Sequence, residues 1–142
     1  MKRELYEDWT AALRSGNYPQ GKGHLKKDGN YCCLGVLCSV ADVPREYHSG
    51  LEEVAFVFNG EPYLGSLNPV RFSVPREAPT LLSFFGMDNV TVNAKKVGMF
   101  SEDVCINLDT VLMYLNDGGK YTFSQIADVL DEYVADGSLV LT

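Results

Sequence analysis

Residues 31–41 read YCCLGVLCSVA, an almost continuous apolar stretch that is followed by Asp42 and Pro44. Eleven residues is long for a strand and suits a buried helix, although hydrophobic periodicity alone does not decide between a buried helix and a buried strand. We therefore expect this stretch to form a buried helix that ends before Pro44.

Apolar residues at helical spacing predict further helices on both sides of this stretch. These helices cover residues 2–15, 79–85, 108–115 and 122–134. Gly16 is a natural stop for the first one, and Pro79 fits the opening position of the second. In the last helix, Thr122 and Gln125 have the spacing of a capping box, in which each side chain satisfies a free backbone amide.

Strand signals are concentrated in the middle of the chain. Asn59 and Gly60 form a typical hairpin turn between the apolar run at 54–58 and a returning strand at 63–64. We also expect a small hairpin or extended pair around residues 24–31, a strand at 70–74 and short extended pieces within 90–99. Taken together, the pattern predicts one α+β domain covering residues 1–142, with about four to five helices on a small, mainly antiparallel sheet.

The charge distribution restricts the partners. The chain has a net charge of −7, yet residues 1–30 hold six basic and four acidic residues, so the positive charge is concentrated in this segment. An acidic surface repels duplex DNA, whereas a small anion could still bind to the amino-terminal segment. We find no run of eighteen apolar residues and no apolar run after Lys2 and Arg3, and we expect a cytoplasmic protein without membrane segments.

Four cysteines, at positions 32, 33, 38 and 105, suggest two kinds of chemistry. Their spacing lacks the paired knuckles of a zinc site, and we expect neither a metal nor another cofactor. Cys32 or Cys33 at a helix start could serve as the nucleophile of a hydrolase or transferase, with His24 as a conceivable base. The aliphatic neighbours instead favour reduced, buried thiols in the core.

Residues 16–30 are the best candidate for ligand binding. Glycines allow backbone amides to approach a phosphate, lysines supply charge and a tyrosine can stack on a base, although the order of a P-loop is absent and a solvated loop is the alternative. Asn116 and Asp117 follow a predicted helix, where polar side chains cap the helix or bind a ligand. The candidate ligand-binding residues are Trp9, Arg14, Tyr18, Gln20, Lys22, Lys26, Lys27, Asn116 and Asp117.

Three sequence blocks resemble a family of small, mostly uncharacterised proteins of bacteriophages and prophages. They are WTAALRSGNY at 9–18 with Gln20 and Gly21, YCCLGVLC at 31–38, and LND at 115–117 followed by Phe123, Ile126 and Ala127. The resemblance covers both ends of the chain and leaves residues 45–100 unmatched. It implies a phage origin rather than a particular activity.

From these observations we expect a phage-type accessory protein that acts in the host cytoplasm by binding. Its partner would be a nucleotide-like small molecule, as for a counter-defence protein that sequesters a nucleotide signal, or a host protein, and a homo-oligomer is possible. One alternative is the cysteine-dependent enzyme described above. Another is a structural or regulatory interaction module that uses exposed apolar surface on the hairpin of residues 54–64.

Overall fold

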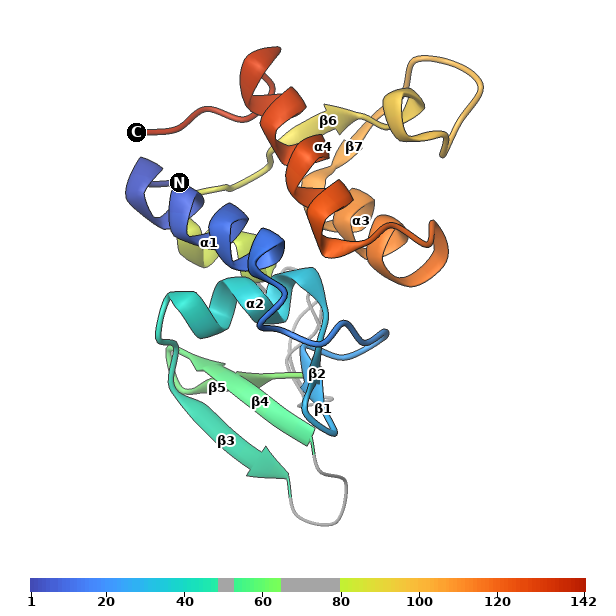
Figure 1. Ribbon diagram of the computed structural model, residues 1–142. Coiled ribbons are helices and arrows are strands. Elements are labelled where there is room, and N and C mark those ends of the chain that lie inside the picture. The colour runs from blue at the N-terminus through green and yellow to red at the C-terminus, as the bar shows by residue number, and fades with distance from the viewer. Residues whose placement is uncertain (49–52, 65–79) are drawn as a thin grey trace.

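Helix α2 (Cys33–Val40) lies in the middle of the fold, with a sheet on one side and helices on the other (Figure 1). The computed structural model describes residues 1–48, 53–64 and 80–142. Val36, Leu37 and Cys38 have no exposed surface. A helix that is apolar all round is expected to be buried on all sides, and the predicted helix at 31–41 is confirmed with slightly narrower limits.

The fold is α+β, with two antiparallel sheets among the described residues. The helices are α1 (Arg3–Ser15), α2, α3 (Leu108–Met113) and α4 (Phe123–Ala135), with short 3₁₀ helices η1 (Leu81–Phe85) and η2 (Ala94–Val97) and a π-helical turn η3 (Tyr114–Gly118). The strands are β1 (Lys26–Lys27), β2 (Asn30–Tyr31), β3 (Arg45–His48), β4 (Glu53–Phe58), β5 (Glu61–Tyr63), β6 (Thr91–Asn93) and β7 (Cys105–Asn107).

Strand β4 is the centre of the larger sheet. It pairs with β3 along one edge and with both β1 and β5 along the other, and β2 extends the sheet beyond β1. In this register Phe56 lies opposite Arg45 and Tyr63. The predicted turn at Asn59 and Gly60 therefore joins β4 to β5, as expected. Strands β6 and β7 form a separate two-stranded sheet.

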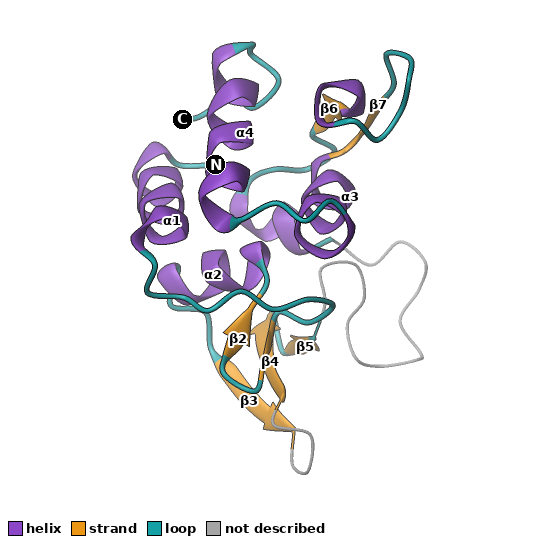
Figure 2. Ribbon diagram, turned by 45° about the vertical axis from the view of Figure 1, so that its right-hand side comes forward, coloured by secondary structure: helices purple, strands orange, loops and turns teal. Residues whose placement is uncertain are grey.

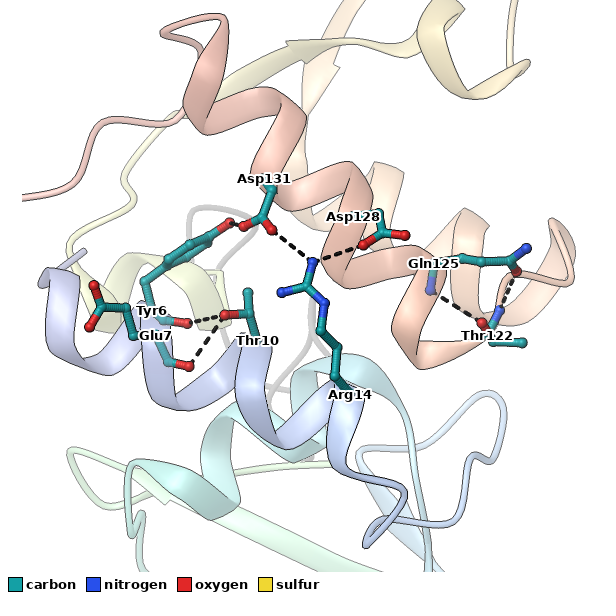
Figure 3. A network of polar contacts seen from close by, with 8 residues as sticks. All are labelled: Tyr6, Glu7, Thr10, Arg14, Thr122, Gln125, Asp128 and Asp131. Carbon is teal, nitrogen blue, oxygen red and sulfur yellow. Dashed lines mark hydrogen bonds and ion pairs between the residues drawn. The ribbon is translucent and has the colours of Figure 1, made fainter.

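Helix α1 packs beside α4 and also lies against α2 (Figures 1 and 2). Arg14 on α1 forms ion pairs with Asp128 and Asp131 on α4, and the Tyr6 hydroxyl donates to Asp131 (Figure 3). Seven of the apolar residues at helical spacing in the predicted helices lie in one continuous hydrophobic core. They are Trp9, Leu13, Leu34, Leu37, Leu112, Ile126 and Leu130.

Gly35 allows α2 to pack directly against the backbone before β1. A Cβ atom at this position would lie 1.8 Å from the Leu25 carbonyl oxygen, a distance that no side chain can occupy. The same carbonyl accepts a hydrogen bond from the Cys32 amide at 3.2 Å. Glycine is unfavourable inside a helix by roughly 1 kcal/mol relative to alanine, so this close approach explains why it stands in α2.

The structure agrees with most of the predicted elements and adds others. The helices expected at 2–15, 108–115 and 122–134 are confirmed within a few residues, and the last one has the complete capping box. The helix expected at 79–85 is a shorter 3₁₀ helix. Strands β3 and β7 were not predicted, and the strand expected at 70–74 lies outside the described residues.

Apolar side chains of the β4–β5 hairpin face the core rather than solvent. Val54, Phe56, Phe58 and Tyr63 each expose 8% or less of their surface. The expectation of an exposed apolar hairpin surface is therefore wrong for the described part of the hairpin. Within the same described ranges, no helix is both long and apolar enough to cross a membrane.

Candidate functional site

The amino-terminal loop, which lies within residues 16–30, meets the start of α2 and the turn η3 at one corner of the molecule. Residues 114–118 continue α3 as a π-helical turn, a geometry that occurs often at functional sites. This turn is wider than an α-helical turn, and it is closed by the Gly119 amide, which donates to the Tyr114 carbonyl. Asn116, in the middle of this turn, exposes only 1% of its surface.

Asn116 holds the three segments together. Its Nδ2 donates to the Gly21 carbonyl and to Asp117 Oδ1, both at 2.8 Å. Its Oδ1 accepts from Gln20 Nε2 at 3.1 Å and from the Cys33 amide at 3.3 Å. An asparagine side chain has two donors and two acceptor sites, so all of them are occupied. Asn116 therefore positions the loop and has no capacity left for a ligand.

The same network uses some of the hydrogen-bonding atoms of Asp117 and Gln20. Asp117 Oδ1 also accepts from the Gly23 amide at 3.1 Å, and Gln20 Nε2 also donates to the Tyr121 carbonyl at 2.9 Å. Among the described residues, none donates to the second carboxylate oxygen of Asp117. This oxygen remains available for an N–H donor.

A small pocket lies beside this network, with about 40 Å³ of accessible space inside about 320 Å³ of empty volume that includes open solvent. Its buried apolar surface comes from Leu25, Cys33 and Leu34, each at most 1% exposed. His24 and Asp117 are half-buried and provide polar groups nearer to solvent. The full lining is Gly23, His24, Leu25, Cys32, Cys33, Leu34, Met113, Asn116 and Asp117. Apolar walls with a few polar groups are typical of small-molecule sites.

Two cysteines in the pocket are poor nucleophiles. Burial raises the pKa of Cys32 to about 11, and it raises the pKa of Cys33 well above the usual range. The Cys32 sulfur accepts the Gly35 amide at 3.4 Å as the amino-terminal cap of α2. Because the thiolate is the reactive form, we expect both cysteines to react only slowly at neutral pH.

The structure brings together only some of the nine candidate binding residues. Gln20, Asn116 and Asp117 meet at the corner, as described above. Trp9 has no exposed surface, and its indole N–H donates to the Cys33 carbonyl at 2.9 Å, so it belongs to the core. The charge of Arg14 is paired with two aspartates of α4. Neither side chain is positioned to contact a ligand at this corner.

The aromatic and basic residues of the loop lie on its outer surface and on the adjoining strands. Tyr18 packs edge-on against Tyr31, with ring centres 5.1 Å apart. Lys26 places its ammonium group 4.9 Å from the centre of the Tyr31 ring. Lys22 is exposed and directly precedes the pocket residue Gly23, whereas Lys27 is half-buried on β1.

Seven of the nine pocket residues, among them His24 and Met113, are absent from the predicted ligand-binding set. Met113 lies inside the predicted helix at 108–115, where its type indicates only a core residue. His24 stands between two glycine-containing turns, and only its neighbours in the fold show that it borders a pocket. Within the described parts of the chain, no group of three histidine, cysteine or acidic residues could hold a metal ion.

Comparison with known proteins gives one match. A family model described as a domain of unknown function, DUF8296, matches residues 1–134, which include every element from α1 to the last turn of α4. Searches of curated proteins and of solved structures returned no significant match. The chain, with its pocket beside Asn116, belongs to the DUF8296 family of proteins.

Proposed function

We propose that the protein acts by binding a nucleotide-like small molecule in the pocket beside Asn116. The observation that carries the proposal is this pocket, which combines apolar walls with an unoccupied carboxylate oxygen of Asp117. Three of its nine lining residues, Gly23, His24 and Leu25, belong to the net-positive segment 1–30 of an otherwise acidic chain. Its accessible space of about 40 Å³ is smaller than a whole ligand needs, so only the edge of a base would enter it.

The charges determine how such a ligand would be oriented. A carboxylate repels phosphate and accepts hydrogen bonds from the N–H groups of a base, so the base would enter the pocket toward Asp117. Leu25 and Leu34 would then contact its ring. The phosphate would point outward toward Lys22, the exposed lysine that precedes the pocket.

The resemblance of its sequence blocks to phage and prophage proteins supports a phage-type accessory role. In that role the protein would act in the host cytoplasm and sequester a nucleotide signal of the host, without chemical conversion of the ligand. Binding of a host protein is the second form of the same role, and it is what we would infer if no nucleotide binds.

A thermal-shift screen against mono-, di- and cyclic nucleotides tests the proposal. A ligand at one hundred times its Kd stabilises the folded state by about 2.7 kcal/mol, which gives a measurable rise in Tm. Asp117→Asn replaces the free acceptor oxygen by a donor and is expected to weaken binding, while its Oδ1 can still accept from Gly23. Absence of any shift with the wild-type protein would contradict the proposal.

Lys22→Ala measures the phosphate contact, with Lys95→Ala on η2 as the matched control, because both lysines are exposed. Loss of a charge-assisted hydrogen bond is expected to weaken binding by about 1.5 to 3 kcal/mol for Lys22, with no change for Lys95. If titrations of the two variants give the same Kd as the wild type, Lys22 does not contact the phosphate.

One observation favours the cysteine-dependent enzyme as a second candidate: Cys32, His24 and Asp117 border the same pocket. The raised pKa of Cys32 opposes it. Labelling of the native protein at neutral pH distinguishes the two functions. We expect the exposed Cys105 to react rapidly and Cys32 only slowly. Rapid labelling of Cys32 in wild-type protein would favour the enzyme.

A further inference from the structure

A second pocket lies at the opposite end of the α3–η3 segment, around Asp109. It has about 40 Å³ of accessible space inside about 270 Å³ of empty volume that includes open solvent. Its polar groups come from Asp109, Thr80, Asn89 and Asn107. Leu82, Met87, Val90 and Leu108 complete the lining. Asp109 is seven residues before Asn116, so the two pockets are separated by about 10 Å along the helix axis.

Asp109 is an unusual residue for such a buried position. It exposes only 3% of its surface. Its Oδ1 accepts from the Thr110 amide at 2.9 Å, whereas its Oδ2 is enclosed and has no hydrogen-bond partner among the described residues. Buried polar atoms in folded proteins nearly always have a partner, and a buried carboxylate oxygen without one needs an explanation.

The surroundings do not compensate the negative charge. No described lysine, arginine or histidine lines the pocket. Burial raises the pKa of Asp109, and the backbone amides of Thr110 and Asp109 only partly oppose this effect. A buried charge is normally paired with an opposite charge. The partner that this carboxylate lacks is therefore a cation or a strong hydrogen-bond donor.

We infer that the Asp109 pocket binds a primary ammonium group of a small organic molecule. An ammonium group supplies the missing positive charge and three N–H donors. One donor would bond to the Asp109 carboxylate, and the others would bond to the Asn89 or Asn107 side-chain oxygen and the Thr80 hydroxyl. The terminal torsion of aspartate is broad, and binding would require Oδ2 to turn toward the pocket that Asp109 lines.

The donor set favours an organic cation over Mg²⁺ or Ca²⁺. Divalent ions of this kind take six or more oxygen ligands and are usually held by more than one carboxylate. The described lining contains a single carboxylate, and its remaining oxygens belong to amides and a hydroxyl. The apolar side chains of Leu82 and Met87 suit the hydrocarbon part of a primary amine. This site is separate from the nucleotide pocket and does not depend on it.

Titration of ¹⁵N-labelled protein with methylammonium chloride tests the inference, with tetramethylammonium chloride at equal ionic strength as the control. Both ions carry one positive charge, but only methylammonium has N–H donors. We expect saturable shifts of the Asn89 and Asn107 side-chain amide signals with methylammonium alone. Equal shifts with both ions, or no saturation up to ~100 mM, would overturn the inference, because a millimolar Kd would be saturated well below that concentration.

Two variants test whether methylammonium binds at Asp109. Asp109→Asn keeps the shape and the acceptor for the Thr110 amide but removes the charge, and it is expected to weaken methylammonium binding by about 10- to 100-fold. Asp88→Asn removes the same charge from a nearby exposed position outside the pocket lining and should leave binding unchanged. Equal weakening in both variants would show that only general electrostatics acts. If Asp109→Asn does not fold, the contrast between the two cations decides alone.

Discussion

Asn116 and Asp109 are both buried polar residues on the continuous α3–η3 segment, yet their hydrogen bonding differs completely. Asn116 uses all its donors and acceptors to join the amino-terminal loop to α2. Asp109 leaves one carboxylate oxygen without a partner. A fully bonded polar group stabilises one arrangement of the chain, whereas an unbonded one opposes folding until a partner is supplied.

This difference separates the structural role of Asn116 from the binding role proposed for Asp109 on the same α3–η3 segment. Sequence analysis places Asn116 among the ligand-binding residues, but its bonds show that it positions the pocket beside it. Asp109 has the position and charge of a helix-start acid that complements the helix dipole, so its sequence context gives no sign of a site. Four variants test and refine the comparison, beginning with the packing under the Asn116 corner.

Gly35→Ala is expected to have the largest effect, a loss of more than about 3 kcal/mol in the free energy of unfolding. The added methyl would lie 1.8 Å from the Leu25 carbonyl oxygen, so α2 would have to separate from the backbone that forms one wall of the pocket beside Asn116. Gly118→Ala is the control, because its Cβ would make only ordinary contacts at 3.7 Å. Urea denaturation measures the stability of both variants. A loss below about 1 kcal/mol for Gly35→Ala would show that the backbone around Gly35 and Leu25 can move apart easily.

Asn116→Ala should cost about 2 to 3 kcal/mol, because it leaves the buried amide of Cys33 and the carbonyl of Gly21 without their partner. The exposed Asn17 provides the control, since Asn17→Ala should change stability by less than about 0.5 kcal/mol. If the two alanine variants unfold at the same urea concentration, the Asn116 network does not stabilise the corner and the comparison with Asp109 fails.

Local patterns were sufficient to predict much of the fold. The apolar stretch at 31–41, the capping box at Thr122 and the turn at Asn59 and Gly60 each determine their own element through neighbouring residues. Strands β3 and β7 contain four and three residues, and their sequences REYH and CIN lack a clear alternation. Their pairing depends on distant partners in the fold, which periodicity does not reveal.

The candidate site was only partly predictable for the same reason. The loop glycines and lysines, together with Asn116 and Asp117, indicated the corner at which the pocket beside Asn116 lies. Sequence spacing could not show that Trp9 turns inward or that Arg14 pairs with residues more than one hundred positions away. The hydrogen bonds of an individual polar side chain depend on tertiary structure, and they decide whether it contacts a ligand or another part of the chain.

Asp131, unlike Asp109, has hydrogen-bond partners for both oxygens of its carboxylate, and the two residues should therefore affect stability differently as the pH is lowered. Burial raises its pKa, but hydrogen bonds from Tyr6 and Arg14 outweigh this effect, so the pKa lies below its usual value. Its contribution to stability is therefore present above about pH 4 and is lost as the pH falls through the lowered pKa. Because the group is partly exposed, we expect Asp131→Asn to cost only about 0.5 to 1 kcal/mol at pH 7. Urea denaturation from pH 7 down to pH 2 should show this difference disappearing; a constant difference would contradict it.

Asp109→Asn is expected to have the smallest effect and the opposite sign. The folded state raises the pKa of Asp109, so it holds a proton more tightly than the unfolded chain, and stability falls as the pH rises from the usual pKa through the raised one. Removing the charge should therefore stabilise the protein at neutral pH, by up to about 1 kcal/mol.

Asp88→Asn is the control, because it shows how much stability the protein gains when any one negative charge is removed from this acidic chain. Urea denaturation of the two variants, without any amine present, would confirm the unpartnered carboxylate if Asp109→Asn gains more than Asp88→Asn. A loss of stability in Asp109→Asn alone would show instead that the carboxylate already has a stabilising partner in the folded chain, and the inferred ammonium site would then have no unsatisfied group to recruit its ligand.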